Sequence, residues 1–77
     1  MGEQEATILE VRPFLVHGVT YYDVTVAYRD RTVDHARLGP EGVPENLNTG
    51  EVVVAMKAAN MIVSIRRLEP GRATGND

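Results

Sequence analysis

The chain has 77 residues, enough for one small hydrophobic core but not for two, because a chain of this length buries only about 60% of the surface that it exposes when unfolded. Its 11 acidic residues outnumber its 8 basic ones, and the formal net charge of -3 excludes the strong positive field that draws proteins non-specifically onto nucleic acid. Cysteine is absent, so disulfides and cysteine zinc sites are excluded, and stability has to come from packing or from self-association.

No segment of the sequence is typical of a membrane anchor. The longest apolar run, Val52–Met56, is far shorter than the roughly 20 residues that cross a bilayer. The acidic start, MGEQE, lacks the basic residues that open a signal peptide. We therefore expect a cytoplasmic protein that does not insert into a membrane.

The first predicted strand lies in the stretch ATILEVRPFLVHG. Its apolar side chains share one parity, as the two-residue period of a strand requires: Leu9, Val11 and Leu15. Pro13 cannot donate a ladder hydrogen bond, so the strand has to bend there, bulge there or lie at a sheet edge. His17 and Gly18 then predict a turn.

The second predicted strand, VTYYDVTVAYRD, has the clearest alternation in the chain. One of its faces carries Tyr22, Val24, Val26 and Tyr28. The residues Arg29–Arg31 predict a hairpin connection, after which TVDHARL indicates a shorter and more polar third strand.

The second half of the chain begins with a loop. Residues 39–50, GPEGVPENLNTG, are too rich in proline and glycine for a long helix and allow at most one helical turn, near Pro44–Leu47. Two further strands, Glu51–Lys57 and Met61–Arg67, follow so closely that they predict an antiparallel hairpin.

Five short strands without a substantial helix predict an all-β fold, a small five-stranded OB-like or SH3-like barrel. The OB-like order fits better, since a long bent first strand and a meander precede a closing hairpin. We expect this single domain to span residues 6–68, with residues 1–5 and 69–77 disordered. The predicted core comprises Leu9, Val11, Val24, Val26, Val52, Val54, Ile62 and Ile65, and the last two can both be buried only if their strand contains a bulge.

The stretch LNTGEVVVAMKAANMIVSI, residues 47–65, resembles the closing half of the transport-associated OB (TOBE) family, which includes molbindin-like molybdate-binding modules. The shared features are a glycine that starts the strand, alternating valines, a Lys-Ala pair, a short polar step and a final apolar strand. The resemblance implies an oxyanion site, for a ligand such as molybdate, at the matching positions Lys57, Ala58, Ala59 and Asn60.

The same four residues have a simpler interpretation. Asn60 tolerates positive φ, so Ala58–Asn60 can serve only to turn the chain. Where the step is a binding site, Lys57, the sole lysine, supplies the positive charge, and its position at a strand end should let its side chain reach solvent or a subunit interface.

A second function class is single-stranded nucleic-acid binding, because OB-folds stack bases on aromatic side chains while arginines hold phosphates. The residues that fit these roles are Tyr21, Tyr28, Arg29, Arg31 and Arg37. Alternation offers the opposite interpretation for the tyrosines, because it buries Tyr22 and Tyr28 and leaves Tyr21 as an ordinary surface aromatic.

The sequence gives no support for catalysis or for metal binding. The histidines, His17 and His35, lie on different predicted strands, and no nucleophile elbow or phosphate loop is present. We therefore expect a non-catalytic module for ligand sensing or protein interaction, without a resident cofactor, that self-associates or joins a larger protein partner.

Overall fold

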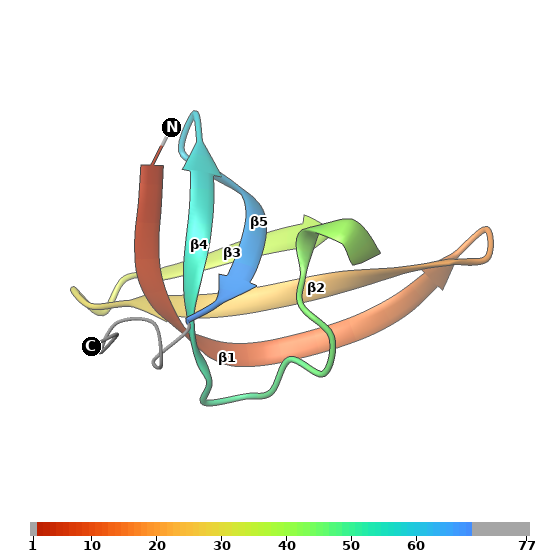
Figure 1. Cartoon of the computed structure of the whole chain (residues 1–77), viewed down its shortest axis with the longest axis horizontal. Coiled ribbons are helices and arrows are strands. Elements are labelled where there is room, and N and C mark those ends of the chain that lie inside the picture. Colours follow the sequence, from red (N-terminus) through yellow and green to blue (C-terminus); the bar gives the residue numbers. More distant parts are fainter. Residues whose placement is uncertain (1, 69–77) are drawn as a thin grey trace, which may run out of the picture.

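A computed structural model describes residues 2–68 of the chain and confirms the all-β prediction (Figure 1). The five strands form one antiparallel sheet in the order β3-β2-β1-β4-β5. The elements are β1 (Gly2–Val16), β2 (Val19–Tyr28), β3 (Val33–Leu38), the 3-10 helix η1 (Pro40–Gly42), β4 (Val52–Ala58) and β5 (Met61–Arg67). No α-helix occurs within the described part of the chain, so no helix there could span a membrane.

The sheet bends strongly but remains open. Its edge strands β3 and β5 approach each other, yet no hydrogen-bonded ladder joins them. The long strand β1 carries the bend, because its first half pairs with β4 and its second half pairs only with β2. The structure therefore gives a curved five-stranded sheet where the sequence predicts a barrel.

Tight turns join β1 to β2 and β2 to β3. His17 and Gly18 connect β1 to β2 with φ values of 50° and 80°, and these positive angles at both central residues are those of a type I′ hairpin turn. The β2–β3 connection is longer and places Arg31 at a φ of 74°, as in a type I turn followed by a left-handed residue. The hairpin predictions at both places are confirmed.

A β-bulge at Leu9 changes which face of β1 is buried. The register passes from Ile8 opposite Val26 to Glu10 opposite Thr25, so Leu9 has no partner of its own. Even-numbered residues such as Ile8 face the core before the bulge, and Val11 faces it afterwards. The prediction that Leu9 lies in the core is wrong, and its side chain is 45% exposed, because a single extra residue reverses the alternation.

The core otherwise follows the predicted alternation except on β4. Val24, Val26, Ile62 and Ile65 lie in the main buried cluster as predicted. On β4 the parity is the reverse of the predicted one, because Val53 and Ala55 belong to the cluster, so Val52 is exposed and Val54, although buried, lies outside the cluster. The main buried cluster consists of Ala6, Ile8, Val24, Val26, Tyr28, Ala36, Leu38, Val53, Ala55, Ile62 and Ile65.

The bulge that the two isoleucines of β5 require is present. Met56 lies opposite Ser64 while Lys57 lies opposite Ile62, so β5 has one residue more than β4 at this point. This extra residue, Val63, brings Ile62 and Ile65 to the same buried face in spite of their different parity.

The chain differs from the prediction at its start and in its loop. Gly2–Glu5 are not disordered, because they extend β1 and pair with the β4 residues Val54–Lys57. The helical turn is Pro40–Gly42 rather than Pro44–Leu47, since a proline at its start fits the first position of a helix. The tail at 69–77, predicted to be disordered, lies outside the described residues.

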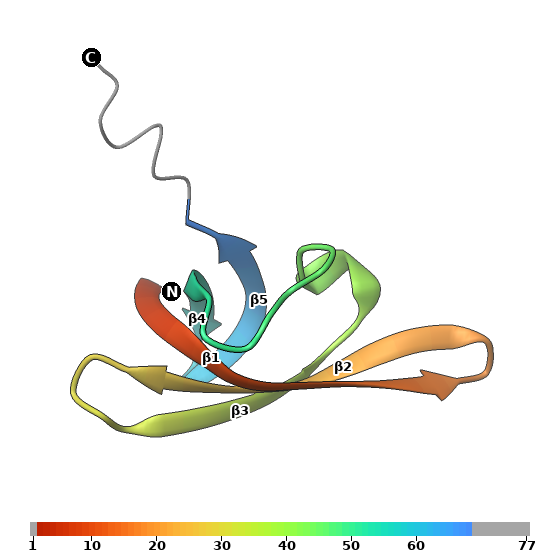
Figure 2. The same ribbon diagram turned by 90° about the horizontal axis from the view of Figure 1, so that it is seen from below.

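The β1–β2 hairpin projects beyond the rest of the sheet (Figures 1 and 2). We call residues 13–22 the arm. The pairing of β1 with β4 reaches only Thr7, and the pairing of β2 with β3 starts at Tyr22, so the two strands of the arm pair only with each other along nearly its whole length. The molecule is accordingly long, with extents of 45 × 24 × 23 Å.

Candidate functional site

The site predicted by resemblance is the hairpin turn between β4 and β5. Lys57 and Ala58 are the last residues of β4, and Ala59 and Asn60 form the turn itself. The turn residues have φ values of 52° and 66°, as a type I′ turn requires. Joining the two strands is therefore a sufficient structural role for this step.

Lys57 does not extend into solvent but reaches across the end of the core. Its Nζ lies 3.5 Å from Oδ2 of Asp34 on β3 and 4.9 Å from the ring centroid of Tyr28 on β2. The Tyr28 hydroxyl donates a hydrogen bond of 2.7 Å to the same Asp34 oxygen. With its side chain only 24% exposed, Lys57 belongs to a Tyr28–Asp34–Lys57 cluster that links three strands, which corrects the expectation of a solvent-directed lysine.

The ionisation of this cluster agrees with its geometry. The hydrogen bond from Tyr28 and, to a lesser degree, the charge of Lys57 hold the pKa of Asp34 below its ordinary value. Burial and the neighbouring carboxylate raise the pKa of Tyr28, so the phenol stays protonated and remains a donor. At neutral pH the cluster thus pairs one anion with one cation around a neutral phenol.

A surface pocket of about 320 Å³ lies beside the β4–β5 turn and the start of β1. Its lining residues are Gly2, Glu3, Gln4, Lys57, Ala59 and Asn60. Glu3 brings a carboxylate to this pocket and pairs with Arg66 at 3.1 Å, while the charge of Lys57 is offset by Asp34. An anion would therefore meet no unpaired lysine charge here.

The five residues of the nucleic-acid hypothesis do not gather in one place. Tyr28 is buried in the core and Arg29 pairs with Glu5 at 3.0 Å. Arg31 occupies the β2–β3 turn. Tyr21 and Arg37 both lie against the Phe14 ring.

Phe14, Tyr21 and Arg37 form a cluster on the outer face of β1, β2 and β3. The Phe14 and Tyr21 rings stack with centroids 5.9 Å apart, and the Arg37 guanidinium lies 4.8 Å from the Phe14 centroid. Arg37 also donates a 3.0 Å hydrogen bond to Asp23, and His35 lies 3.8 Å from the same carboxylate. Sequence reasoning missed Phe14, although a two-residue turn at His17–Gly18 already places it opposite Tyr21.

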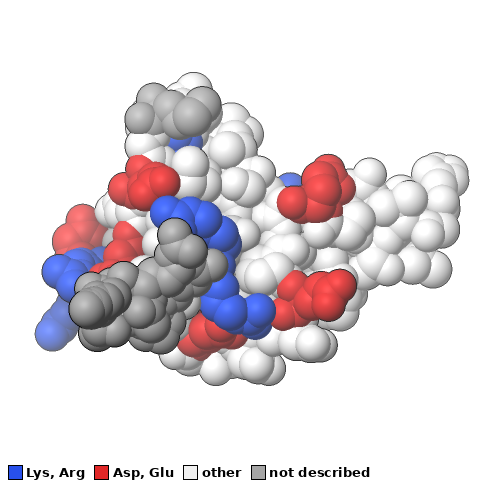
Figure 3. All heavy atoms as spheres, in the orientation of Figure 1, with Lys and Arg blue, Asp and Glu red and all other residues white. Residues whose placement is uncertain are grey.

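The arm carries exposed apolar side chains. Leu15 is 71% exposed, and Val16 and Val19 beside the turn are also exposed. Residues 13–22 contain no Lys, Arg, Asp or Glu, and this end of the molecule, at the right of Figure 3, shows neither basic nor acidic side chains on the face drawn. Its chemistry is that of an apolar contact surface.

An apolar groove adjoins the base of the arm. Its volume is about 320 Å³, and it is lined by Val11, Pro13, Tyr22, Val43, Pro44, Asn46 and Leu47. The arm strands form one wall and the loop before β4 forms the other. None of these lining side chains is charged, which distinguishes the groove from the pocket beside Lys57.

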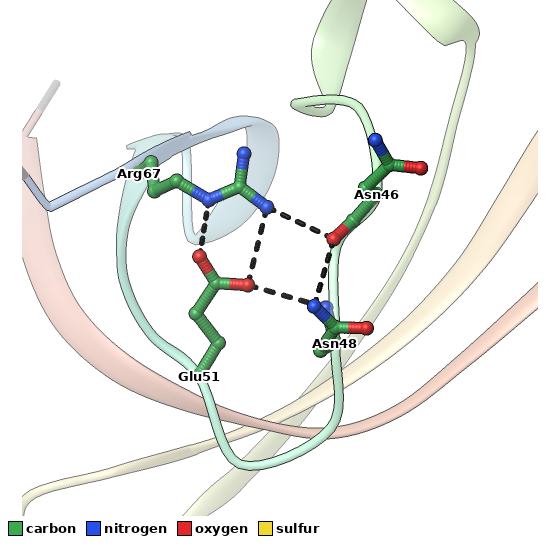
Figure 4. A network of polar contacts seen from close by, with 4 residues as sticks. All are labelled: Asn46, Asn48, Glu51 and Arg67. Atoms are coloured by element: carbon green, nitrogen blue, oxygen red, sulfur yellow. Dashed lines mark hydrogen bonds and ion pairs between the residues drawn. The ribbon is translucent and has the colours of Figure 1, made fainter.

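A polar network fixes the loop that forms the far wall (Figure 4). Arg67 on β5 contacts both carboxylate oxygens of Glu51 and donates a hydrogen bond of 3.0 Å to the backbone oxygen of Asn46. Glu51 in turn accepts a hydrogen bond from the backbone N–H of Asn48. The Arg67 contact lowers the pKa of Glu51, so the network is charged at neutral pH and has a structural role.

The described residues contain no group of three metal-ligating side chains. The chain matches no protein-family model, and no curated protein and no solved structure matches it. The geometry of the two ends of the molecule therefore carries the functional argument.

Proposed function

We propose that this chain is a non-catalytic, OB-like β-barrel module for protein interaction, and that the arm is its contact element. The exposed, uncharged apolar surface of residues 13–22 carries the proposal. Apolar surface of this kind on a projecting hairpin stabilises nothing within the same chain, and it becomes favourable when a partner covers it.

The OB-like assignment has two supports. β1 pairs with both β2 and β4, and the edge strands β3 and β5 approach without pairing, as in a partly open five-stranded Greek-key barrel. The resemblance of residues 47–65 to TOBE modules points the same way. TOBE-like oxyanion binding at Lys57–Asn60 is the less favoured form of the proposal, because Asp34 already offsets the lysine charge.

Site-specific photo-crosslinking tests the contact element. A benzoylphenylalanine residue replaces Leu15 in one variant and Val63 in a matched control, since Val63 is also exposed, at 49%, but lies on β5. We expect protein adducts from position 15 in cells and few from position 63. Adducts at position 63 alone, or no protein adduct at either position, would refute the proposed role of the arm.

The Phe14–Tyr21–Arg37 cluster favours single-stranded nucleic-acid binding as the second candidate, because a base can stack on an aromatic pair beside a guanidinium. Arg37 already covers Phe14 and is paired with Asp23, so we expect weak binding. Titration with labelled single-stranded DNA and RNA at several salt concentrations tests this. Low-micromolar binding that falls steeply with salt and is lost in Tyr21→Ala would replace the protein-interaction proposal.

A further inference from the structure

The apolar face of the core continues along the arm and ends uncovered. Val11, Pro13 and Leu15 follow the bulge with one parity, so they share the inner face of the ribbon. Val11 packs against the core, Pro13 lines the groove, and Leu15 is 71% exposed. The inner face therefore presents a projecting leucine and a groove side by side.

Leu15 and the groove cannot meet within one chain. Leu15 lies two residues beyond Pro13, which is about 7 Å along a strand. A stiff two-stranded ribbon does not fold back over so short a distance. A two-fold axis close to position 14 would place the Leu15 of each copy in the groove of the other, which is the reciprocal contact that an isologous dimer requires.

We propose that the arm docks on a second copy of this chain, with Leu15 of each copy seated in the groove formed by Val11, Pro13, Tyr22, Val43 and Leu47 of the other. This inference rests on the proposed function and names its partner. Charge does not oppose a second copy at this place: each copy has a net charge of -3, and approach through residues 13–22, which contain no Lys, Arg, Asp or Glu, keeps the carboxylates of the two copies apart.

The contact is made by side chains and not by strand addition. The two-residue turn makes Val16 and Val19 a hydrogen-bonded pair, and such pairs alternate along the ladder, so Pro13 and Tyr22 form a non-hydrogen-bonded pair. The nitrogen of Pro13 therefore points to the free edge of β1, where it removes a donor that an added strand would need.

The size of the surface predicts a weak dimer. The arm and the far wall of the groove supply roughly 15 residues per copy, fewer than the 20–30 that each side of a standard interface contributes. We therefore expect a weak dimer that dissociates readily, as transient or regulated dimers do.

Sedimentation velocity from low to high micromolar concentration measures the dimer. We expect the wild type to shift toward the dimer with concentration, and Leu15→Thr to weaken association by about tenfold or more, whereas Val63→Thr on β5 leaves it unchanged. Circular dichroism checks that both variants keep the β-sheet spectrum. A wild type that stays monomeric at high micromolar concentration would overturn the inference.

Because the chain has no cysteine, disulfide trapping locates the contact without background. A mixture of Leu15→Cys and Val43→Cys proteins should form a cross-linked heterodimer faster than a mixture of Val63→Cys and Val43→Cys. Equal rates in the two mixtures would show that Leu15 does not approach the groove of a second copy.

The two proposals can fail separately. Adducts with another protein at position 15, together with a monomeric purified chain, would overturn the second-copy inference and keep the interaction function. Flotation with phosphatidylcholine vesicles that depends on Leu15 would assign the arm to a lipid surface and overturn both. Both proposals would also be overturned if position 15 gave no protein adduct, the cysteine variants did not cross-link, and the sedimentation coefficient did not change with concentration.

Discussion

The two ends of the molecule differ in how completely their side chains are satisfied. At the Tyr28–Asp34–Lys57 cluster, each polar group has a partner on another strand, and the only lysine of the chain is neutralised by a carboxylate. On the arm, Leu15 and the two valines beside the turn, Val16 and Val19, are exposed, and residues 13–22 contain no Lys, Arg, Asp or Glu. The first end links three strands of the sheet, and the second is the surface that we propose a partner covers.

The strongest test of this difference applies the same kind of truncation to both regions. Ile8 is fully buried beside the bulge, and its replacement by Ala should destabilise the fold by about 2–5 kcal/mol through lost burial and the cavity that remains. Leu15→Ala removes a side chain that is already exposed and should change monomer stability by less than about 0.5 kcal/mol. Urea unfolding measures both changes, at a protein concentration low enough for the chain to be monomeric.

Equal losses of unfolding free energy from these two substitutions would contradict this difference between the two regions. They would mean that Leu15 is covered within its own chain, and the arm would then be part of the core rather than an interaction surface.

The polar end should respond to loss of a single charge. Asp34→Asn preserves the shape of the side chain but leaves Lys57 without its counter-charge, and we expect a loss of about 1–2 kcal/mol. Adding Lys57→Met to this variant should cost little more, because the interaction is already gone. A double-mutant cycle from thermal unfolding checks this, and additive losses would show that the two side chains do not interact.

The same pair predicts how stability depends on acid. The pKa of Asp34 is lower in the folded chain than its ordinary value of 3.8, so the stability that it contributes is fully present above pH 3.8 and is lost as the pH falls from there through the lower folded-state pKa. Glu51 behaves in the same way through Arg67. Asp34→Asn should therefore flatten the decline of the melting temperature between about pH 4 and pH 2, and an unchanged slope would contradict the assignment.

Introducing asparagine should change the melting temperature by different amounts in the turns at the two ends of the molecule. Ala59 has a φ of 52°, which alanine tolerates poorly and asparagine accepts, so Ala59→Asn should stabilise by about 1 kcal/mol and raise the melting temperature by roughly 4–8 °C. His17→Asn makes the matching change on the arm, which contacts the rest of the sheet only at its base. We expect a smaller shift there, and a larger shift from His17→Asn would show that the arm unfolds with the core.

The smallest expected effect concerns anions. Because Asp34 offsets the charge of Lys57, millimolar molybdate, tungstate, sulfate or phosphate should move the melting temperature by less than about 2 °C. A ligand at about 100 times its dissociation constant would stabilise by about 2.7 kcal/mol. A shift of that size, abolished in Lys57→Met, would restore the oxyanion site.

Local signals in the sequence were enough to predict that five strands form and that hairpin turns join three pairs of them, but not where the first strand begins. The alternation around Val24 and Val26 and the close spacing of the last two strands correctly predict pairing and much of the core. The bulge at Leu9 was missed, although apolar residues of both parities, Ile8 and Val11, lie on either side of it. The need for a bulge near Ile62 and Ile65 was visible, since both parities there are apolar.

The candidate sites were harder to predict, since they depend on contacts between distant strands. The partner of Lys57 lies 23 positions earlier in the chain, and no local pattern joins Lys57 to Asp34. The arm is defined by where the ladders of β4 and β3 stop, which is a property of register and not of the residues in the arm itself. Its uncharged composition was nevertheless readable from the sequence.

An NMR titration of the wild type against its own concentration tests the central claim most directly. Amide resonances recorded from about 20 μM to 1 mM report every region in one experiment, across the range in which a dimer of this size should form. We predict shifts confined to residues 11–22 and 43–47, while Tyr28, Asp34 and Lys57–Asn60 stay unchanged. Concentration-dependent shifts centred on Lys57–Asn60, together with unchanged resonances in the arm, would contradict the proposed contact.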